Sequence, residues 1–262
     1  MTNLFSKDAF KDKRIIISGG AGDIGTAVAL GFVNAGAAQI ALLDKDTKQL
    51  EIPTKKIKSL GCECINFELD LANPTEIEDV VKSLYSHYPS WDVLVTTAGI
   101  YIGGPFTEFN VDDWDLMMKI NSRAVFILSK LVAKEMMARK SGKIIHISSG
   151  STYFGTPGSG PYSASKAVVN QLTQTMAVEW GPHNIQVNAI CPTVTQTKFL
   201  NFVADDALHE KMRNKLKSKM PLGHLLETGD IVPAVLFLAS EGAQLINGAI
   251  IPIDGGSRLV ST

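Results

Sequence analysis

Short runs rich in Ile, Val and Leu alternate with longer helical patterns from one end of this 262-residue sequence to the other. The runs are nearly continuous rather than alternately apolar and polar, which is typical of strands buried on both faces of a parallel sheet. Repeated strand–helix alternation predicts a doubly wound α/β fold, with a seven-stranded parallel sheet, helices on both faces and right-handed crossovers. The expected strands are 14–18, 39–43, 63–67, 92–96, 143–148, 186–190 and 249–253, and the expected helices are 24–35, 48–60, 74–88, 111–139, 161–180 and 229–240.

One domain accounts for the whole length, because a chain with 45% hydrophobic residues can bury a single large core and shows no repeat or linker. Residues 193–226 interrupt the alternation with a long, polar and Lys-rich stretch. Such a stretch is either a solvated surface excursion or a lid over a site, and its position directly after a strand favours the lid. We therefore expect a single domain over 1–262, with a substrate lid at about 193–226.

The composition argues against several classes of partner. The net charge is −1 and the basic residues are scattered, which disfavours nucleic acid and anionic membrane surfaces. No apolar run reaches the ~18 residues of a membrane span, and residues 1–14 lack the apolar segment of a signal peptide. The three cysteines, Cys62, Cys64 and Cys191, cannot all pair, and the five histidines are dispersed. We expect a soluble cytoplasmic protein with reduced thiols and no metal site.

The first expected strand leads directly into a glycine-rich turn at residues 18–25 and then into a helix. In that context glycines let the backbone approach a pyrophosphate closely, while the helix N-terminus offers free N–H groups and the positive end of its dipole. Asp44 closes the second strand, where a carboxylate can accept hydrogen bonds from both ribose hydroxyls of NAD and repels the 2′-phosphate of NADP. Asp44 could instead simply begin a turn, and Lys45 follows it. We expect a Rossmann site that binds NAD rather than NADP.

Tyr162 and Lys166 stand four residues apart in an expected helix, so both side chains lie on one helical face. An ammonium group close to a phenol favours the phenolate and lowers the phenol pKa from about 10 toward neutrality. The pair can then act as a general acid and base on an alcohol or carbonyl oxygen. This spacing often occurs by chance, and the alternative is a core tyrosine beside a lysine that reaches the surface. The interpretation therefore depends on the other motifs.

Taken together, the motifs resemble in order and spacing those of the short-chain dehydrogenase/reductase family, over nearly the whole chain. Residues 18–25 resemble the family's Thr-Gly-x-x-x-Gly-Ile-Gly turn, with Asp23 in place of a glycine, and we expect that carboxylate to turn outward and cap the helix. Residues 96–99, Thr-Thr-Ala-Gly, stand where the family has Asn-Asn-Ala-Gly. Residues 188–197 resemble Asn-x-x-x-Pro-Gly-x-x-x-Thr, with Thr193 in place of glycine.

The resemblance implies three groups of site residues. The catalytic residues would be Asn121, Ser149, Tyr162 and Lys166. The cofactor-binding residues would be Gly19, Gly22, Asp23, Ile24, Gly25, Asp44, Asp70, Leu71, Ala98, Gly99, Tyr162, Lys166, Pro192, Val194 and Thr197. The substrate-binding residues would be Ser149, Ser151, Tyr153, Phe154 and Tyr162, with pocket walls from 100–102, 150–156 and 193–202.

The activity implied by the resemblance is NAD-dependent hydride transfer that interconverts a secondary alcohol and a ketone. Hydroxyl and aromatic side chains in the expected pocket walls suit a small polar substrate, such as a sugar, a polyol or a hydroxy acid. Two alternatives remain: a 3-oxoacyl carrier reductase, which predicts NADP preference, and a non-catalytic dinucleotide sensor on the same fold. Residues 247–256 resemble the segment that family tetramers bury between subunits, so a homotetramer is expected.

Overall fold

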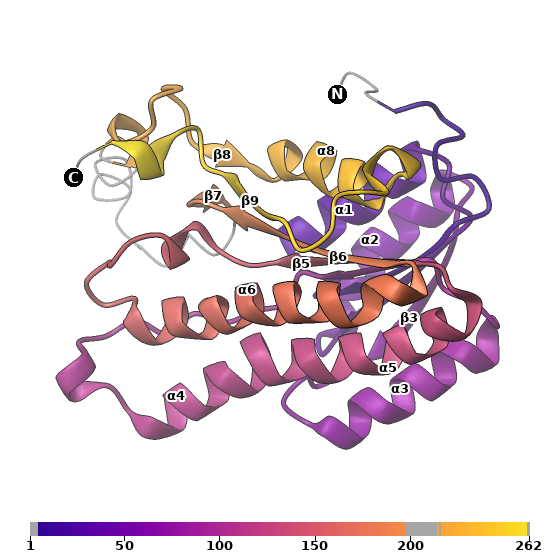
Figure 1. The fold of residues 1–262 in the computed structure, drawn as a ribbon, viewed down its shortest axis with the longest axis horizontal. Coiled ribbons are helices and arrows are strands. Elements are labelled where there is room, and N and C mark those ends of the chain that lie inside the picture. Colours follow the sequence, from indigo (N-terminus) through magenta and orange to yellow (C-terminus); the bar gives the residue numbers. More distant parts are fainter. Residues whose placement is uncertain (1–4, 198–213, 215, 261–262) are drawn as a thin grey trace.

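The computed structural model describes residues 5–197, 214 and 216–260. A parallel sheet of seven strands, in the order β3-β2-β1-β4-β5-β6-β9, runs through the centre of the molecule and confirms the predicted fold (Figure 1). Its strands are β1 Arg14–Ser18, β2 Gln39–Asp44, β3 Glu63–Glu68, β4 Val93–Thr96, β5 Gly142–Ile147, β6 Ile185–Pro192 and β9 Ile250–Ile253. The strand order reverses direction between β1 and β4, and in such sheets ligands bind at that point, beyond the carboxyl ends of the strands.

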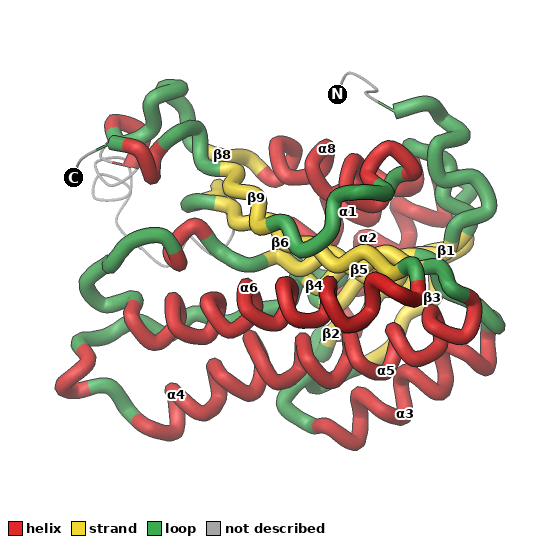
Figure 2. The backbone as a smooth tube through the Cα atoms, viewed as in Figure 1, coloured by secondary structure: helices red, strands yellow, loops and turns green. Residues whose placement is uncertain are grey.

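Helices cover both faces of the sheet (Figure 2). They are α1 Asp23–Asn34, α2 Thr47–Ser59, α3 Pro74–His87, α4 Val111–Met118, α5 Ala124–Arg139, α6 Gly160–Trp180 and α8 Thr228–Ala239. Successive side chains of a strand point to opposite faces, so β1 supplies both cores. Ile15 and Ile17 pack with α1, α2 and α8, whereas Ile16 packs with α3, α5 and α6. The near-continuous apolar runs therefore arise because each strand is buried on both sides.

One expected helix is interrupted. The stretch predicted as a single helix over 111–139 forms α4, a π-helical turn at Lys119–Arg123, and then α5. A π turn holds an extra residue within a helix and is often found at functional sites. Here it contains Asn121, whose side chain is engaged outside the helix, as described below.

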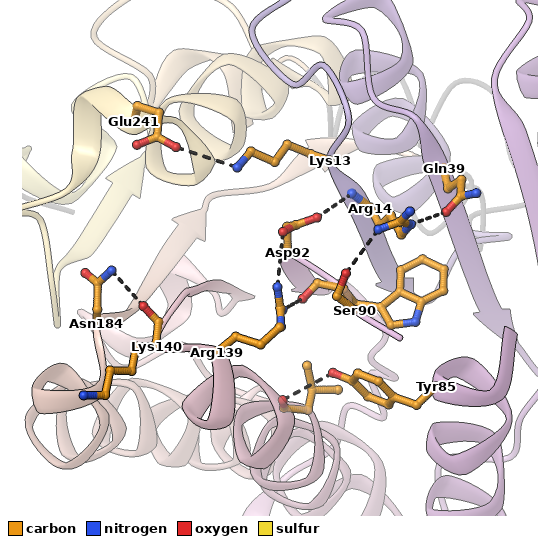
Figure 3. Close-up of polar contacts among 12 residues, drawn as sticks. Lys13, Arg14, Gln39, Tyr85, Ser90, Asp92, Arg139, Lys140, Asn184 and Glu241 are labelled. Atoms are coloured by element: carbon orange, nitrogen blue, oxygen red, sulfur yellow. Dashed lines mark hydrogen bonds and ion pairs between the residues drawn. The ribbon is translucent and has the colours of Figure 1, made fainter. Parts of the chain in front are cut away.

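Charged side chains complete the amino-terminal edge of the sheet (Figure 3). The backbone N–H of Arg14, at the start of β1, donates to Oδ2 of Asp92 at 2.9 Å. The Arg139 guanidinium lies 3.5 Å from Oδ1 of the same carboxylate, and Lys13 pairs with Glu241 at 3.8 Å. These contacts lie at the amino-terminal ends of the strands. The candidate site described below lies at the opposite, carboxyl-terminal ends.

The centre of the expected lid over 193–226, residues 198–213 and 215, lies outside the described residues. Its two ends are joined by a short parallel ladder between β7 Thr195–Gln196 and β8 Leu226–Glu227. Cys62, Cys64 and Cys191 are buried and unpaired. None of the helices formed by the described residues is both long and apolar enough to span a membrane.

Candidate active site

A cavity of about 1070 Å³ opens at the carboxyl ends of β1, β2, β4, β5 and β6. It brings together most of the residues that the sequence indicated, from both the cofactor set and the catalytic set. The predicted residues that line it are Gly19, Gly22, Asp23, Ile24, Gly25, Asp44, Asp70, Leu71, Ala98, Gly99, Ser149, Ser151, Phe154, Tyr162, Lys166, Pro192, Val194 and Thr197. Within the described part of the chain, no three His, Cys, Asp or Glu side chains are grouped so that they could hold a metal ion.

The glycine turn lies at one end of the cavity, and its backbone is packed closely against itself. Gly19 has φ +75°, a conformation that glycine adopts without strain. A Cβ on Gly25 would lie 2.1 Å from the carbonyl oxygen of Gly19, so no larger residue fits there. Gly22 precedes α1 as its N-cap and provides no side-chain cap, which leaves first-turn N–H groups available to an anion.

Asp23 differs from the sequence expectation. The capping position is held by Gly22, in an extended conformation, and Asp23 is the first residue of α1 and one of the residues that line the cavity. Asp23 is therefore not the N-cap residue of α1. A carboxylate in the first turn interacts favourably with the helix dipole.

In the turn after β4, Thr96 and Thr97 stand where the family motif has two asparagines. The Thr97 hydroxyl donates to the carbonyl oxygens of Ser18 at 2.8 Å and Gly19 at 3.2 Å, which ties this turn to the glycine turn. The Thr96 hydroxyl is buried and has no hydrogen-bond partner within the residues that the structure describes. A Cβ on Gly99 would lie 3.2 Å from Nζ of Lys166, so this turn also passes close to the catalytic candidates.

Asn121 is fully buried and does not line the cavity. Its Oδ1 accepts the backbone N–H of Ile100 at 2.8 Å, and its Nδ2 donates to the carbonyl oxygen of Ile100 at 2.9 Å. The same amide also donates to the hydroxyl of Ser165 at 3.0 Å. Asn121 thus ties the loop after β4 to α6, which carries Tyr162 and Lys166.

Burial dominates the ionisation of Tyr162 and Lys166. It lowers the pKa of Lys166 to about 8, and the Lys166 ammonium donates to the carbonyl oxygen of Ile147 at 2.9 Å. Burial also raises the pKa of Tyr162, and a hydrogen bond with the Ser149 hydroxyl acts in the opposite direction. In the protein without cofactor, burial therefore determines the direction of both pKa shifts, because desolvation disfavours the charged form of each group.

Tyr101 contacts Tyr162 directly. Their ring centroids are 5.3 Å apart with an interplanar angle of 72°, an edge-to-face arrangement. The Tyr101 hydroxyl lies 3.1 Å from that of Ser159, immediately before α6, and both residues line the cavity. The sequence analysis placed Tyr101 only in a pocket wall. Its contact with Tyr162 was missed because the two residues are far apart in the chain. The one indication in the sequence is that Tyr101 closely follows the turn at residues 96–99.

Tyr153, expected to contact substrate, does not line the cavity. Its hydroxyl donates to the carbonyl oxygen of Ile250 at 3.4 Å, and the Arg258 guanidinium lies 5.5 Å from its ring centroid. The preceding turn runs from Ser149 through a 3₁₀ segment, Gly150–Thr152, and brings Ser151 to the cavity. Tyr153 therefore belongs to the contact between this turn, β9 and the segment that follows it.

Comparisons with known proteins agree with this geometry. A family model described as Enoyl-(Acyl carrier protein) reductase matches residues 19–258. The chain is 33% identical over 256 residues to the 5-keto-D-gluconate 5-reductase of Escherichia coli K12, covering 98% of each protein. It is 33% identical to the 3-oxoacyl-(acyl-carrier-protein) reductase FabG of Thermotoga maritima, covering 93% of this chain and 97% of that protein. The solved gluconate 5-dehydrogenase of Burkholderia cenocepacia J2315, in complex with NADP and tartrate, is 30% identical, with a TM-score of 0.90 over 97% of this chain and 99% of that one.

Proposed function

The chain belongs to the short-chain dehydrogenase/reductase family, and we propose that it is an NAD-dependent oxidoreductase that interconverts a secondary alcohol and a ketone on a small polar substrate. One observation carries the proposal: a single cavity holds both the glycine turn with Asp44 and the group of Ser149, Tyr162 and Lys166. A protein that only bound a dinucleotide would not need Tyr162 beside Ser149 at the far end of that cavity.

The residues fit a nicotinamide dinucleotide. The closed turn and the uncapped start of α1 suit a pyrophosphate, and the Asp44 carboxylate beside them suits ribose hydroxyls. We propose that Asp70 and Leu71 flank the adenine, and that Pro192, Val194 and Thr197 contact the nicotinamide end. When bound, the cofactor supplies or accepts the hydride.

The protein's own groups would handle the proton and hold the substrate. Ser149 hydrogen-bonds the substrate oxygen and keeps it against the Tyr162 hydroxyl. Tyr162 takes the hydroxyl proton during oxidation and returns a proton to the oxygen during reduction. Lys166, fixed at Ile147, stabilises the phenolate form, and Asn121 keeps the neighbouring loop in place.

The substrate end of the cavity combines hydroxyl groups with apolar walls. Ser149, Ser151 and Ser159 lie on one cavity surface together with Tyr101 and Phe154. Such a lining suits a sugar, a polyol or a hydroxy acid, the class to which the substrates named for two relatives, 5-keto-D-gluconate and gluconate, belong.

The test is reduced-nicotinamide absorbance across sugars, polyols, sugar acids and their ketones, each with NAD and with NADP. Turnover of one polar class with a higher kcat/KM for NAD is the expected result. Tyr162→Phe is the control: it should keep NADH binding and lose turnover. Wild-type protein that binds NADH but converts nothing in the panel would favour the dinucleotide sensor.

A second candidate is a 3-oxoacyl carrier reductase, which the description of the family model and the similarity to the Thermotoga maritima reductase support. This activity would show as turnover of an acetoacetyl thioester with NADPH at a higher kcat/KM than for any polyol. Asp44 argues against it, since a carboxylate at the end of β2 repels a 2′-phosphate. The bound NADP of the Burkholderia cenocepacia relative makes the cofactor comparison the decisive part of the panel.

We further propose a single-domain subunit that assembles as a homotetramer in the cytoplasm. Edge strand β9 supports assembly, because all four of its residues, Ile250–Ile253, are only partly buried, whereas every residue of its neighbour β6 is buried. Sedimentation at two protein concentrations tests the assembly, and a monomer at both would contradict it.

A further inference from the structure

Three successive backbone amides of the glycine turn point at the end of β2. The N–H groups of Gly19 and Gly20 donate to the carbonyl oxygen of Leu43 at 2.8 and 3.2 Å. The next N–H, that of Ala21, donates to Oδ2 of Asp44 at 3.1 Å. The backbone of Leu43 therefore accepts the first two amides of the turn, and the Asp44 side chain accepts the third.

The Asp44 carboxylate is itself held in this orientation. Its Oδ1 accepts the backbone N–H of Asp46 at 3.2 Å, so one amide fixes each oxygen. An ionised carboxylate has about four lone-pair sites, and two backbone amides leave room for hydroxyl groups of a ligand. Hydrogen bonds to a charged acceptor are also stronger than neutral ones. Asp44 can therefore anchor the turn and contact a ligand at the same time.

We propose that Asp44 is a positioning residue that holds the glycine turn in its cofactor-binding shape through Ala21. The proposal rests on the proposed function, since it takes this turn as the pyrophosphate site. It changes the expected effect of a substitution. If the carboxylate only repelled a 2′-phosphate, its removal would tighten NADP binding. Because it also anchors Ala21, its removal loosens a turn that NAD and NADP share.

Hydrogen exchange of the turn in the protein without cofactor tests the anchor directly. Asp44→Ala should accelerate exchange at Ala21 on the order of tenfold, because that N–H loses a charged acceptor. Asp46→Ala is the matched control: its carboxylate is at the same strand end but accepts the N–H of Gln49 and does not contact the turn. It should leave exchange at Ala21 unchanged. Equal exchange in wild type and Asp44→Ala would overturn the proposal.

Fluorescence titration with NADH and NADPH supplies the second readout. Asp44→Ala should weaken NADH binding by about tenfold or more and should not tighten NADPH binding. Asp44→Asn keeps an oxygen that can accept from Ala21 but removes the negative charge. It should therefore bind NADPH more tightly than Asp44→Ala does. An Asp44→Ala protein that binds NADPH as tightly as Asp44→Asn, or more tightly, contradicts the anchoring role.

The two proposals fail in different ways. Wild-type protein that bound neither NADH nor NADPH would contradict the proposed function, whereas the exchange rate at Ala21 in the free protein would still report whether Asp44 holds the turn.

Discussion

His146, a fully buried residue of β5, should make the protein sensitive to acid. Its Nδ1 lies 2.8 Å from the Thr173 hydroxyl and its Nε2 lies 3.0 Å from the Ser129 hydroxyl. The Thr173 hydroxyl donates to the carbonyl oxygen of Val169 at 2.8 Å, so it can only accept from Nδ1–H. Ser129 must then donate to Nε2, and both ring nitrogens of a neutral imidazole are satisfied. A second ring proton would require the Ser129 hydroxyl to rotate and accept instead of donating.

The magnitude follows from the pKa. Burial lowers the pKa of His146 to about 3, and the Lys166 ammonium acts in the same direction. The unfolded chain has a histidine pKa of about 6.5, so it binds more protons than the folded protein once the pH falls below that value. The contribution of neutral His146 to the free energy of unfolding is complete above pH ~6.5 and is lost as the pH falls toward ~3. At pH ~5 the loss is about 2 kcal/mol, from about 1.5 units at about 1.4 kcal/mol each.

Urea unfolding at fixed protein concentration, from pH 8 to pH 5, measures this loss. His146→Gln cannot titrate, and it should be less stable than wild type at pH 8 but lose about 2 kcal/mol less on acidification. His183→Gln, at an exposed position, should retain the wild-type pH dependence. If wild type and His146→Gln lose the same free energy of unfolding between pH 8 and pH 5, carboxylates rather than His146 carry the acid sensitivity and the reasoning is refuted.

Three further outcomes are expected. Gly25→Ala should weaken NADH binding in a fluorescence titration, because its Cβ would lie 2.1 Å from the Gly19 carbonyl oxygen and force the turn open; unchanged affinity would contradict this. Tyr101→Ala should lower kcat by about tenfold in steady-state kinetics, whereas Tyr101→Phe, which keeps the ring against Tyr162, should retain most of it. Burial raises the pKa of Tyr162, so the rate of alcohol oxidation, which needs the phenolate, should increase with pH. The rate of ketone reduction, which needs the neutral phenol, should not increase. Parallel pH profiles for the two directions would count against Tyr162 as the acid–base group.

The parts of the fold that were predictable are those encoded locally. All seven strands of the main sheet were expected from their apolar runs, and the glycine turn could be recognised because its residues are contiguous. The cavity follows from the parallel sheet, since the carboxyl ends of the strands meet at one edge. The π turn that contains Asn121 was missed, because a helix with one extra residue has nearly the same pattern of apolar positions as a regular helix.

The ionisation of the site without cofactor could not be predicted, for a different reason. The spacing of Tyr162 and Lys166 indicates that the two groups are neighbours, but it does not indicate how much solvent they lose. Lys166 is only 3% exposed, and burial shifts its pKa and that of Tyr162 in opposite directions, each toward the neutral form. Tyr153 was misplaced similarly, because a sequence position in a pocket-forming turn does not fix which way a side chain points.

The side-chain contacts that sequence reasoning missed join segments far apart in the chain, and they involve motif residues. Asn121 holds the backbone of Ile100, and Asp44 holds that of Ala21. Motif comparison assigns such residues to the reaction or to the ligand, yet here each also fixes the shape of a loop that lines the cavity. Loss of activity after substitution at either position is therefore insufficient to show that the side chain touches cofactor or substrate. The two roles separate only when the geometry of the loop is measured in the protein without ligand, as for the amide of Ala21.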